Sequence, residues 1–304
     1  MSESVIELRG LTKRFGRHTA VDGLDMEVQA GTVMGLLGLN GAGKTTTIRM
    51  LTGHLHPSEG EARVFGEDPR RHCEALRQKV GYVSENMDLP GWMTPEKAVR
   101  FNASLYPRWN HRLAEALLDE FALRGKGRYG QLSKGQKRKV CILVALCQDA
   151  RLLIMDEPTS GLDVAARRDF LQRVLEIACD KGTTVILSSH LLTDIERVSD
   201  RIALIHEGKV IKDGHIEDLK AGVRRLQFAA AVDKGQLSEV FKVLRFEADT
   251  RQTTATVADF DSGRLNAWCE KADCTGKVQV LGLNLEDIFV EMVRGKDGEQ
   301  EVPA

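Results

Sequence analysis

The sequence predicts an α/β fold, in which a mostly parallel, helix-covered sheet follows N-terminal antiparallel strands and is interrupted by a helical insertion. A small α+β domain is expected at the C-terminal end. Short apolar runs alternate with amphipathic stretches, which indicates strands joined by helices. One apolar run leads into a glycine-rich segment that opens a helix. The chain has 304 residues, which fits a main domain with an appended one.

The composition narrows the classes of protein. Hydrophobic residues make up 42% of the chain and charged residues 29%, so a sizeable core can form. The net charge of −1 lacks the basic excess of nucleic-acid-binding proteins, and we expect no nucleic-acid partner. No apolar run approaches the ~18 residues of a membrane helix. Residues 1–10 carry no apolar signal core, so we expect a cytoplasmic protein.

The cysteines form no CxxC pair. We expect reduced, buried thiols, which are typical of a reducing compartment. The spacing of Cys269 and Cys274 would suit a metal, but no second pair nearby completes a site. The chain has six cysteines: Cys73, Cys141, Cys147, Cys179, Cys269 and Cys274.

In the first part of the chain we expect strands at 5–9, 20–28 and 32–37. The third is a continuous apolar run bounded by glycines, which is typical of a buried parallel strand. A helix is expected from Lys44 to about Thr52, ending near Gly53.

A helical insertion is expected over about residues 90–150. Helical patterns cover 94–106, 111–123 and a stretch from Ser133, and Thr94-Pro95-Glu96 supplies a cap, a first-turn proline and an early acid. Beyond the insertion we expect a strand at 151–155, a helix at 164–180 and a strand at 183–188.

A smaller domain is expected over 221–294, after a main domain of residues 1–220. The short segments with strand and helix patterns in this part of the sequence indicate an α+β domain. The tail at 295–304 is polar, and we expect it to be loose. The predicted strands are 226–232, 240–247 and 253–258, and the predicted helices are 264–271 and 285–293.

Residues Gly38 to Thr45 (GLNGAGKT) match GxxxxGK[ST] between a buried strand and a helix. Glycines let the backbone turn its N–H groups toward phosphate oxygens, and the helix N-terminus adds partial positive charge. Lys44 then reaches the β- and γ-phosphates, and the Thr45 hydroxyl binds Mg²⁺. The alternative is an ordinary glycine-rich turn. The context favours a nucleotide site on a P-loop NTPase core.

Asp156 and Glu157 follow the apolar run Leu152 to Met155. A charged pair at the end of a buried strand is costly unless it has a use. We expect Asp156 to hold Mg²⁺ and Glu157 to act as general base on the water that attacks the γ-phosphate. The alternative is an acidic turn.

Leu132-Ser133-Lys134-Gly135-Gln136 resembles the LSGGQ signature of ATP-binding cassette (ABC) proteins. Ser160-Gly161-Leu162-Asp163 resembles their D-loop, and Ser188-Ser189-His190 resembles their switch-histidine motif. These segments occur in the family's order over roughly residues 5–220. The chain is similar to the ATP-binding subunit of a bacterial export-type ABC transporter.

The resemblance implies that ATP lies between two cassettes, from a homodimer or a pair with a related subunit. Lys44, Glu157 and His190 would be catalytic, with His190 contacting the γ-phosphate, and Thr45, Asp156 and Glu85 would face Mg²⁺. A transmembrane permease would be the partner, and the protein would lie on the inner face of the membrane. The implied nucleotide-binding residues are Phe15 (stacked on adenine), Gly38, Asn40, Gly41, Ala42, Gly43, Lys44, Thr45, Thr46, Ser133, Gly135 and Gln136.

Two positions depart from the family pattern. Glu85 replaces the expected glutamine of the Q-loop, and we expect it to stay on the metal side; the alternative is a solvent-facing acid. Lys134 replaces a glycine of the signature and either assists phosphate binding or points to solvent. The apolar loop 86–95 meets the permease in the family, or else packs inside the insertion.

Overall fold

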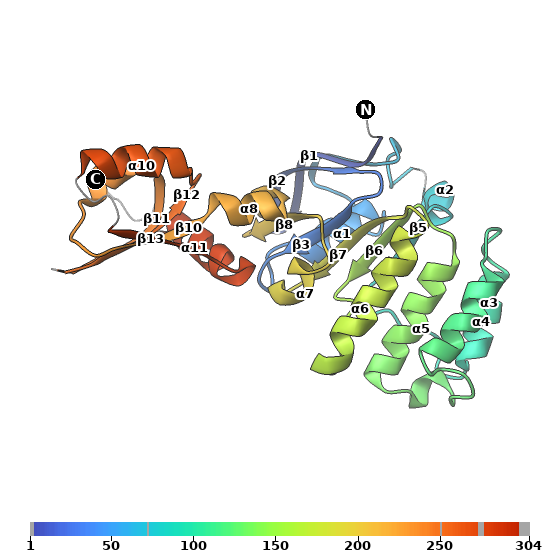
Figure 1. Cartoon of the computed structure of the whole chain (residues 1–304). Helices are drawn as coiled ribbons and strands as arrows, with labels where there is room; N and C mark the ends of the chain where they lie inside the picture. Colours follow the sequence, from blue (N-terminus) through green and yellow to red (C-terminus); the bar gives the residue numbers. More distant parts are fainter. Residues whose placement is uncertain (1–2, 72, 250, 273–276, 298–304) are drawn as a thin grey trace. The chain divides into compact units, whose positions relative to one another are not determined.

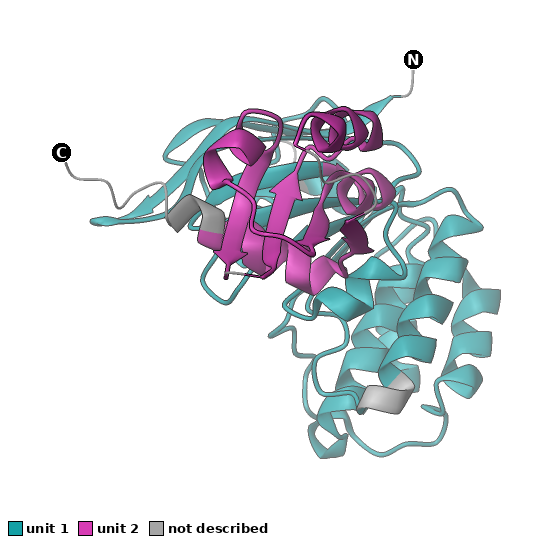
Figure 2. Ribbon diagram, turned by 60° about the vertical axis from the view of Figure 1, so that its left-hand side comes forward, with its two compact units in different colours: residues 1–213 teal, residues 214–304 magenta. Residues whose placement is uncertain are grey.

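The computed structural model describes residues 3–71, 73–249, 251–272 and 277–297. Contacts divide the chain into two compact units, residues 1–213 and 214–304, coloured separately in Figure 2. The domain boundary expected after residue 220 falls inside helix α8 (Ile216–Gly222). The expected domain bounds, 1–220 and 221–294, stay a prediction. The loose tail predicted from residue 295 lies outside the described residues from 298 onward.

The first unit is built on a six-stranded sheet of order β5-β6-β7-β3-β8-β9. The neighbours β5/β6, β6/β7, β7/β3 and β3/β8 all run parallel, as predicted. Every residue of β3, β6 and β7 is buried. The strands are β3 (Val33–Leu37), β5 (Val80–Val83), β6 (Leu152–Asp156), β7 (Thr184–Ser189), β8 (Arg201–His206) and β9 (Lys209–His215).

A separate antiparallel sheet of order β2-β1-β4 accompanies it. Its strands are β1 (Ser4–Phe15), β2 (His18–Gln29) and β4 (Glu59–Val64). Their apolar side chains share one core with helix α1 (Lys44–Leu51) and the central strands. The P-loop before α1 is therefore held between the two sheets.

The helical insertion forms as predicted, with α3 (Pro95–Ala103), α4 (His111–Glu120) and α5 (Lys134–Cys147) packed together beside α6 (Val164–Cys179) (Figure 1). The Thr94 hydroxyl caps α3 by accepting from the Lys97 N–H. Ten residues of α5 are buried, so this helix is the centre of the insertion. Shorter elements are α2 (Cys73–Arg77), the 3₁₀ turn at Tyr129–Gln131 and α7 (Leu192–Glu196).

The second unit has an antiparallel sheet of order β11-β12-β10-β13. Leu226, Phe228 and Val257 face a core that also holds Trp268 from α10. The elements are β10 (Arg224–Phe228), α9 (Lys234–Ser238), β11 (Lys242–Ala248), β12 (Thr253–Ala258), α10 (Ser262–Lys271), β13 (Val278–Gly282) and α11 (Leu285–Asp297). The sequence prediction lacked α8, which opens this unit, and also α9 and β13.

The structure also bears on the expectations for the cysteines and for membrane-spanning helices. Cys141, Cys147 and Cys269 are buried, as expected, whereas Cys179 is exposed, because it ends α6 on the solvent side. The Cys73 side chain and Cys274 lie outside the described residues. Over the described part of the chain, no helix is both long enough and apolar enough to span a bilayer.

Candidate functional site

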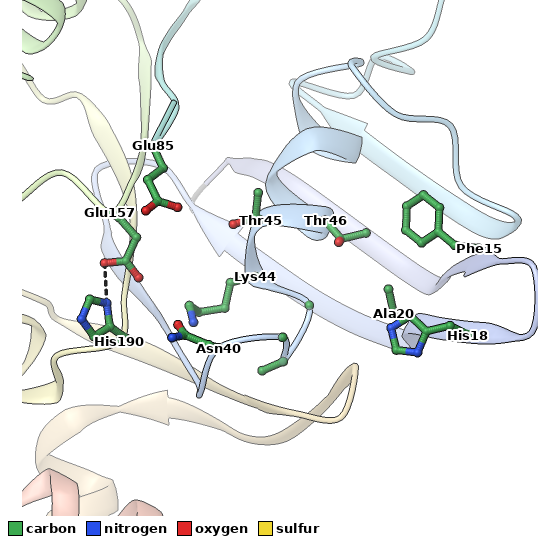
Figure 3. A pocket seen from close by; sticks show the side chains of 13 residues that line it. Phe15, His18, Ala20, Asn40, Lys44, Thr45, Thr46, Glu85, Glu157 and His190 are labelled. Atoms are coloured by element: carbon green, nitrogen blue, oxygen red, sulfur yellow. Dashed lines mark hydrogen bonds and ion pairs between the residues drawn. The ribbon is translucent and has the colours of Figure 1, made fainter. Parts of the chain in front are cut away.

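A cavity of about 460 Å³ lies where the P-loop meets the ends of the parallel strands. Figure 3 shows residues from distant parts of the sequence pointing into it, among them Lys44, Glu157 and His190. Most of the predicted site residues line the cavity, together with two that the sequence did not indicate, His18 and Ala20. The lining residues are Phe15, His18, Ala20, Asn40, Gly41, Ala42, Gly43, Lys44, Thr45, Thr46, Glu85, Glu157 and His190.

The P-loop owes its shape to a left-handed glycine. Gly43 has φ 107°, and a Cβ there would lie 2.5 Å from the Ala20 carbonyl oxygen. Any side chain would therefore push the loop away from β2. Since α1 begins at Lys44, the first N–H groups of the helix face the cavity side of this turn, where they favour an anion.

Lys44 is almost fully buried at the floor of the loop. Its ammonium donates to the carbonyl oxygens of Gly38 at 2.7 Å and Leu39 at 3.2 Å. Burial lowers its pKa, and the nearby carboxylates of Glu157, Asp156 and Glu85 partly oppose that shift. The P-loop itself thus holds the cation in place. Gly38 does not line the cavity but shapes it, because a Cβ there would lie 2.3 Å from the Ile205 carbonyl oxygen.

Glu157 and His190 form a pair across β6 and β7. His190 Nδ1 lies 2.9 Å from Glu157 Oε2, drawn as the dashed line in Figure 3. Burial raises the pKa of the Glu157 carboxyl, and His190 opposes that shift. A carboxylate of raised pKa in a cleft suits a general base.

The backbone of Glu157 is unusual for its residue type. Its φ is 51°, in the left-handed region, and its N–H lies 3.2 Å from both the Ser188 carbonyl oxygen and the Ser188 hydroxyl. Left-handed backbone at a non-glycine residue costs about 1–3 kcal/mol and is concentrated at functional sites. Neighbouring β7 thus holds the carboxylate where it faces the cavity.

Asp156 lies beneath the cavity and is only 1% exposed. The Ser188 hydroxyl donates to its Oδ1 at 2.5 Å, whereas Oδ2 is buried without a hydrogen-bond partner among the described residues. A buried carboxylate oxygen left unpaired is costly, and a hard divalent cation would satisfy it. Together with Thr45 and Glu85 on the cavity wall, these oxygen donors fit Mg²⁺ completed by phosphate oxygens.

The signature segment lies elsewhere. Ser133 caps α5, accepting from the Gln136 N–H while Gln136 Oε1 accepts from the Ser133 N–H, which forms a capping box. Ser133 is exposed, and neither it nor Gly135 nor Gln136 is among the described residues that line this cavity. The structure therefore divides the predicted nucleotide-binding residues into two groups.

Lys134 is exposed, as in the solvent-facing alternative, and a role in phosphate binding stays a prediction. Its aliphatic stem packs on Gly161, where a Cβ would lie 2.8 Å from Lys134 Cγ. Gly135 also packs closely on Gly161, since a Cβ added at position 135 would lie 3.0 Å from the Gly161 carbonyl oxygen. The signature and the D-loop are thus packed against each other within one chain.

Comparisons with known proteins agree with this geometry. A family model described as "ABC transporter" matches residues 21–160. The chain is 36% identical over 224 residues to the probable multidrug ABC transporter ATP-binding protein YbhF of Escherichia coli (strain K12), covering 72% of this chain but only 38% of that protein. It is 34% identical over 304 residues to the daunorubicin resistance ATP-binding protein DrrA3 of Streptomyces coeruleorubidus, covering 95% of this chain and 92% of that one.

A solved structure described as the ATP binding subunit of an ABC transporter is also similar. It is 29% identical, has a TM-score of 0.64, and the match covers 71% of this chain and 92% of that one. DrrA3 matches nearly the whole chain, and the site has the P-loop and a strand-end carboxylate in one cavity. The chain therefore belongs to the ABC transporter family, as an ATP-binding protein with the ABC ATPase fold.

Proposed function

We propose that this chain is the ATP-hydrolysing subunit of an export-type ABC transporter and that it works as one of two cassettes with ATP clamped between them. The observation that carries this proposal is the division of the site. Lys44, Glu157 and His190 share one cavity, while Ser133 presents the N-terminus of α5 outside it. A second copy or a related subunit would supply the missing signature segment.

The groups in the cavity match the needs of phosphoryl transfer to water. The P-loop N–H groups and Lys44 would hold the phosphates, and Phe15, which is 49% exposed, offers a ring face for the adenine. Glu157 would accept the proton of the attacking water, and His190 would orient it against the γ-phosphate. Mg²⁺ held by Thr45, Asp156 and Glu85 would neutralise charge that develops on the phosphates.

The helical insertion offers a surface for a membrane partner. Trp92 is 60% exposed on the loop before α3, and Phe101 and Leu105 are exposed at its far end. Met93 in the same loop is buried, so the apolar loop 86–95 both packs inside the insertion and presents an anchor. Exposed aromatic residues are typical of interface anchors. A transmembrane permease would bind here and keep the protein on the inner face of the membrane.

The names of the relatives favour export. YbhF is described as a probable multidrug ABC transporter ATP-binding protein and DrrA3 as a daunorubicin resistance ATP-binding protein, and both names concern drugs. The second relative matches the present chain over both units, so the C-terminal unit belongs to the same kind of protein.

Substitution of the general base tests the proposal. Glu157→Gln should lower the rate of ATP hydrolysis by about 10²–10⁴-fold, because the amide cannot accept the proton, while ATP binding persists. Phosphate release measures the first effect, and gel filtration with ATP and Mg²⁺ should show a stable dimer. Glu217→Gln, at an exposed position of α8, is the control. A Glu157→Gln protein that stays monomeric at saturating ATP contradicts the two-cassette arrangement.

A further inference from the structure

The loop that follows β5 is fastened to the signature region by its backbone carbonyl groups. Arg138 on α5 donates through Nη1 to the Ser84 carbonyl at 2.6 Å and through Nη2 to the Glu85 carbonyl at 2.8 Å. Further along, the N–H of Gly130 donates to the Gly91 carbonyl at 3.0 Å and that of Tyr129 to the Met93 carbonyl at 2.6 Å. Residues 84–93 are therefore bound at both ends to residues 129–138.

Arg138 carries the part of this attachment that is nearest the ATP site. It is only 6% exposed, and a buried guanidinium group is costly unless its donors are satisfied. The planar fork of the group suits two acceptors held side by side. Here both acceptors are backbone carbonyl oxygens. Arg138 therefore holds the backbone of the loop and contacts no side-chain acceptor through these two bonds.

The two carbonyl groups flank the Cα of Glu85. Figure 3 shows the Glu85 carboxylate directed into the cavity on the side of Thr45 and Glu157. Since the side chain begins at that Cα, the two hydrogen bonds restrict where the carboxylate lies. Glu85 itself is exposed, so its own burial does little to fix it.

We propose that Arg138 is a positioning residue for the divalent-cation side of the ATP site and acts through the Glu85 carboxylate. The inference rests on the proposed ATPase function and extends it to a residue that does not line the cavity. The same arginine lies one turn after the capped start of α5. The cation site of this chain is thereby joined to the segment that faces the partner's nucleotide.

Mn²⁺ binding tests the proposal without relying on turnover. The free and bound cation are distinguished by electron paramagnetic resonance, with each protein saturated with a non-hydrolysable ATP analogue. Arg138→Met should weaken Mn²⁺ binding by about 10-fold, as is usual when a residue that orients a metal ligand is lost. Arg138→Lys should recover part of that loss, because an ammonium group can still donate to a carbonyl. Lys137→Met, at the preceding position of the same helix, should bind Mn²⁺ like the wild type.

A double-mutant cycle with Glu85→Ala decides whether Arg138 acts through Glu85. If it does, adding Arg138→Met to Glu85→Ala causes no further loss of Mn²⁺ affinity, whereas independent effects would add. Additive losses, or wild-type Mn²⁺ binding by Arg138→Met, overturn the proposal. A wild-type protein that binds neither the ATP analogue nor Mn²⁺ contradicts the proposed function instead, and the inference with it. Should Arg138→Met fail to fold, Arg138→Lys and Arg138→Gln enter the same cycle.

Discussion

At the scale of single residues, Glu157 combines burial, a left-handed backbone and a close contact with His190. Burial disfavours the charged carboxylate, and the imidazole favours it. The pKa of Glu157 is raised because burial is the larger of these effects. His190 would therefore have two roles in the same place: it would orient the attacking water, and it favours the ionised form of Glu157.

The pH dependence of hydrolysis should reveal the second role. In His190→Ala the lowering contribution of the histidine is lost, so the pKa of Glu157 rises further and less carboxylate is ionised at a given pH. The acid limb of the kcat/KM profile should therefore move to higher pH, in addition to a fall in rate. Residual phosphate release across the acid range measures the shift. His111→Ala, at the exposed start of α4, serves as control, and an acid limb that stays in place would contradict the assignment.

The sequence located the cavity residues that belong to motifs, but not His18 or Ala20. No local pattern marks His18. It lies in the cavity because β1 and β2 pair antiparallel and place it opposite Phe15. Arg138 stands in the basic run Lys137 to Lys139, and such a run is usually a solvated face. The burial of Arg138 depends on the loop after β5 reaching α5, which is a long-range contact.

At the scale of elements, the predicted strands of the six-stranded sheet were those with continuous apolar runs, β3, β6 and β7. These lie inside the six-stranded sheet, where both faces are covered. The prediction lacked β8, and it also lacked β4 and β9, whose charged side chains suit the edges of sheets. It also lacked β5, where Gly81 interrupts the pattern. A Cβ at that glycine would lie 3.1 Å from the Ala145 carbonyl oxygen, so the strand packs closely against α5 there.

The packing of the signature helix on the D-loop makes a prediction about stability. Gly161→Ala places a side chain at φ 84° and against the Lys134 stem. It should lower the free energy of unfolding by about 1–2 kcal/mol from the backbone alone, and by more from the steric contact. Gly182→Ala is a matched control, with φ 67° and nothing within 4 Å of the added Cβ.

Denaturant unfolding of both variants separates the two contributions. The extra loss in Gly161→Ala should be recovered when Lys134→Ala is added, since the shorter side chain leaves room for the new methyl group. If Gly161→Ala and Gly182→Ala lower the free energy of unfolding equally, the contact with Lys134 does not contribute to stability.

At the scale of the whole molecule, the second unit has a charged cluster of its own. Glu291 of α11 is 2% exposed, and its Oε1 accepts from Arg225 at 3.1 Å and Arg245 at 3.4 Å. Thr256 of β12 pairs with both arginines across the sheet. The cluster fastens the C-terminal helix to the polar face of the sheet, opposite the apolar core.

Removal of this carboxylate should affect one unit only. Glu291→Ala should lower the free energy of unfolding of residues 214–304 by about 1.5–3 kcal/mol, the usual loss for hydrogen bonds to a charged group. The partly exposed arginines can turn to water, which limits the cost. Calorimetry measures the change, with exposed Glu286→Ala as control. ATP binding should stay unchanged, because the cavity lies within residues 1–213, and a loss of binding would mean that the units are energetically coupled.

The position of Ser133 outside the cavity of its own chain has a consequence for mass action. When every turnover requires a serine from a second molecule, a lone chain hydrolyses nothing. Below the dissociation constant of the pair, halving the amount of protein should therefore quarter the total rate, and the specific activity should fall on dilution. A partner that tethers two chains would abolish this dependence, so the kinetic order in protein reports directly whether the two halves of the site meet by collision or are held together.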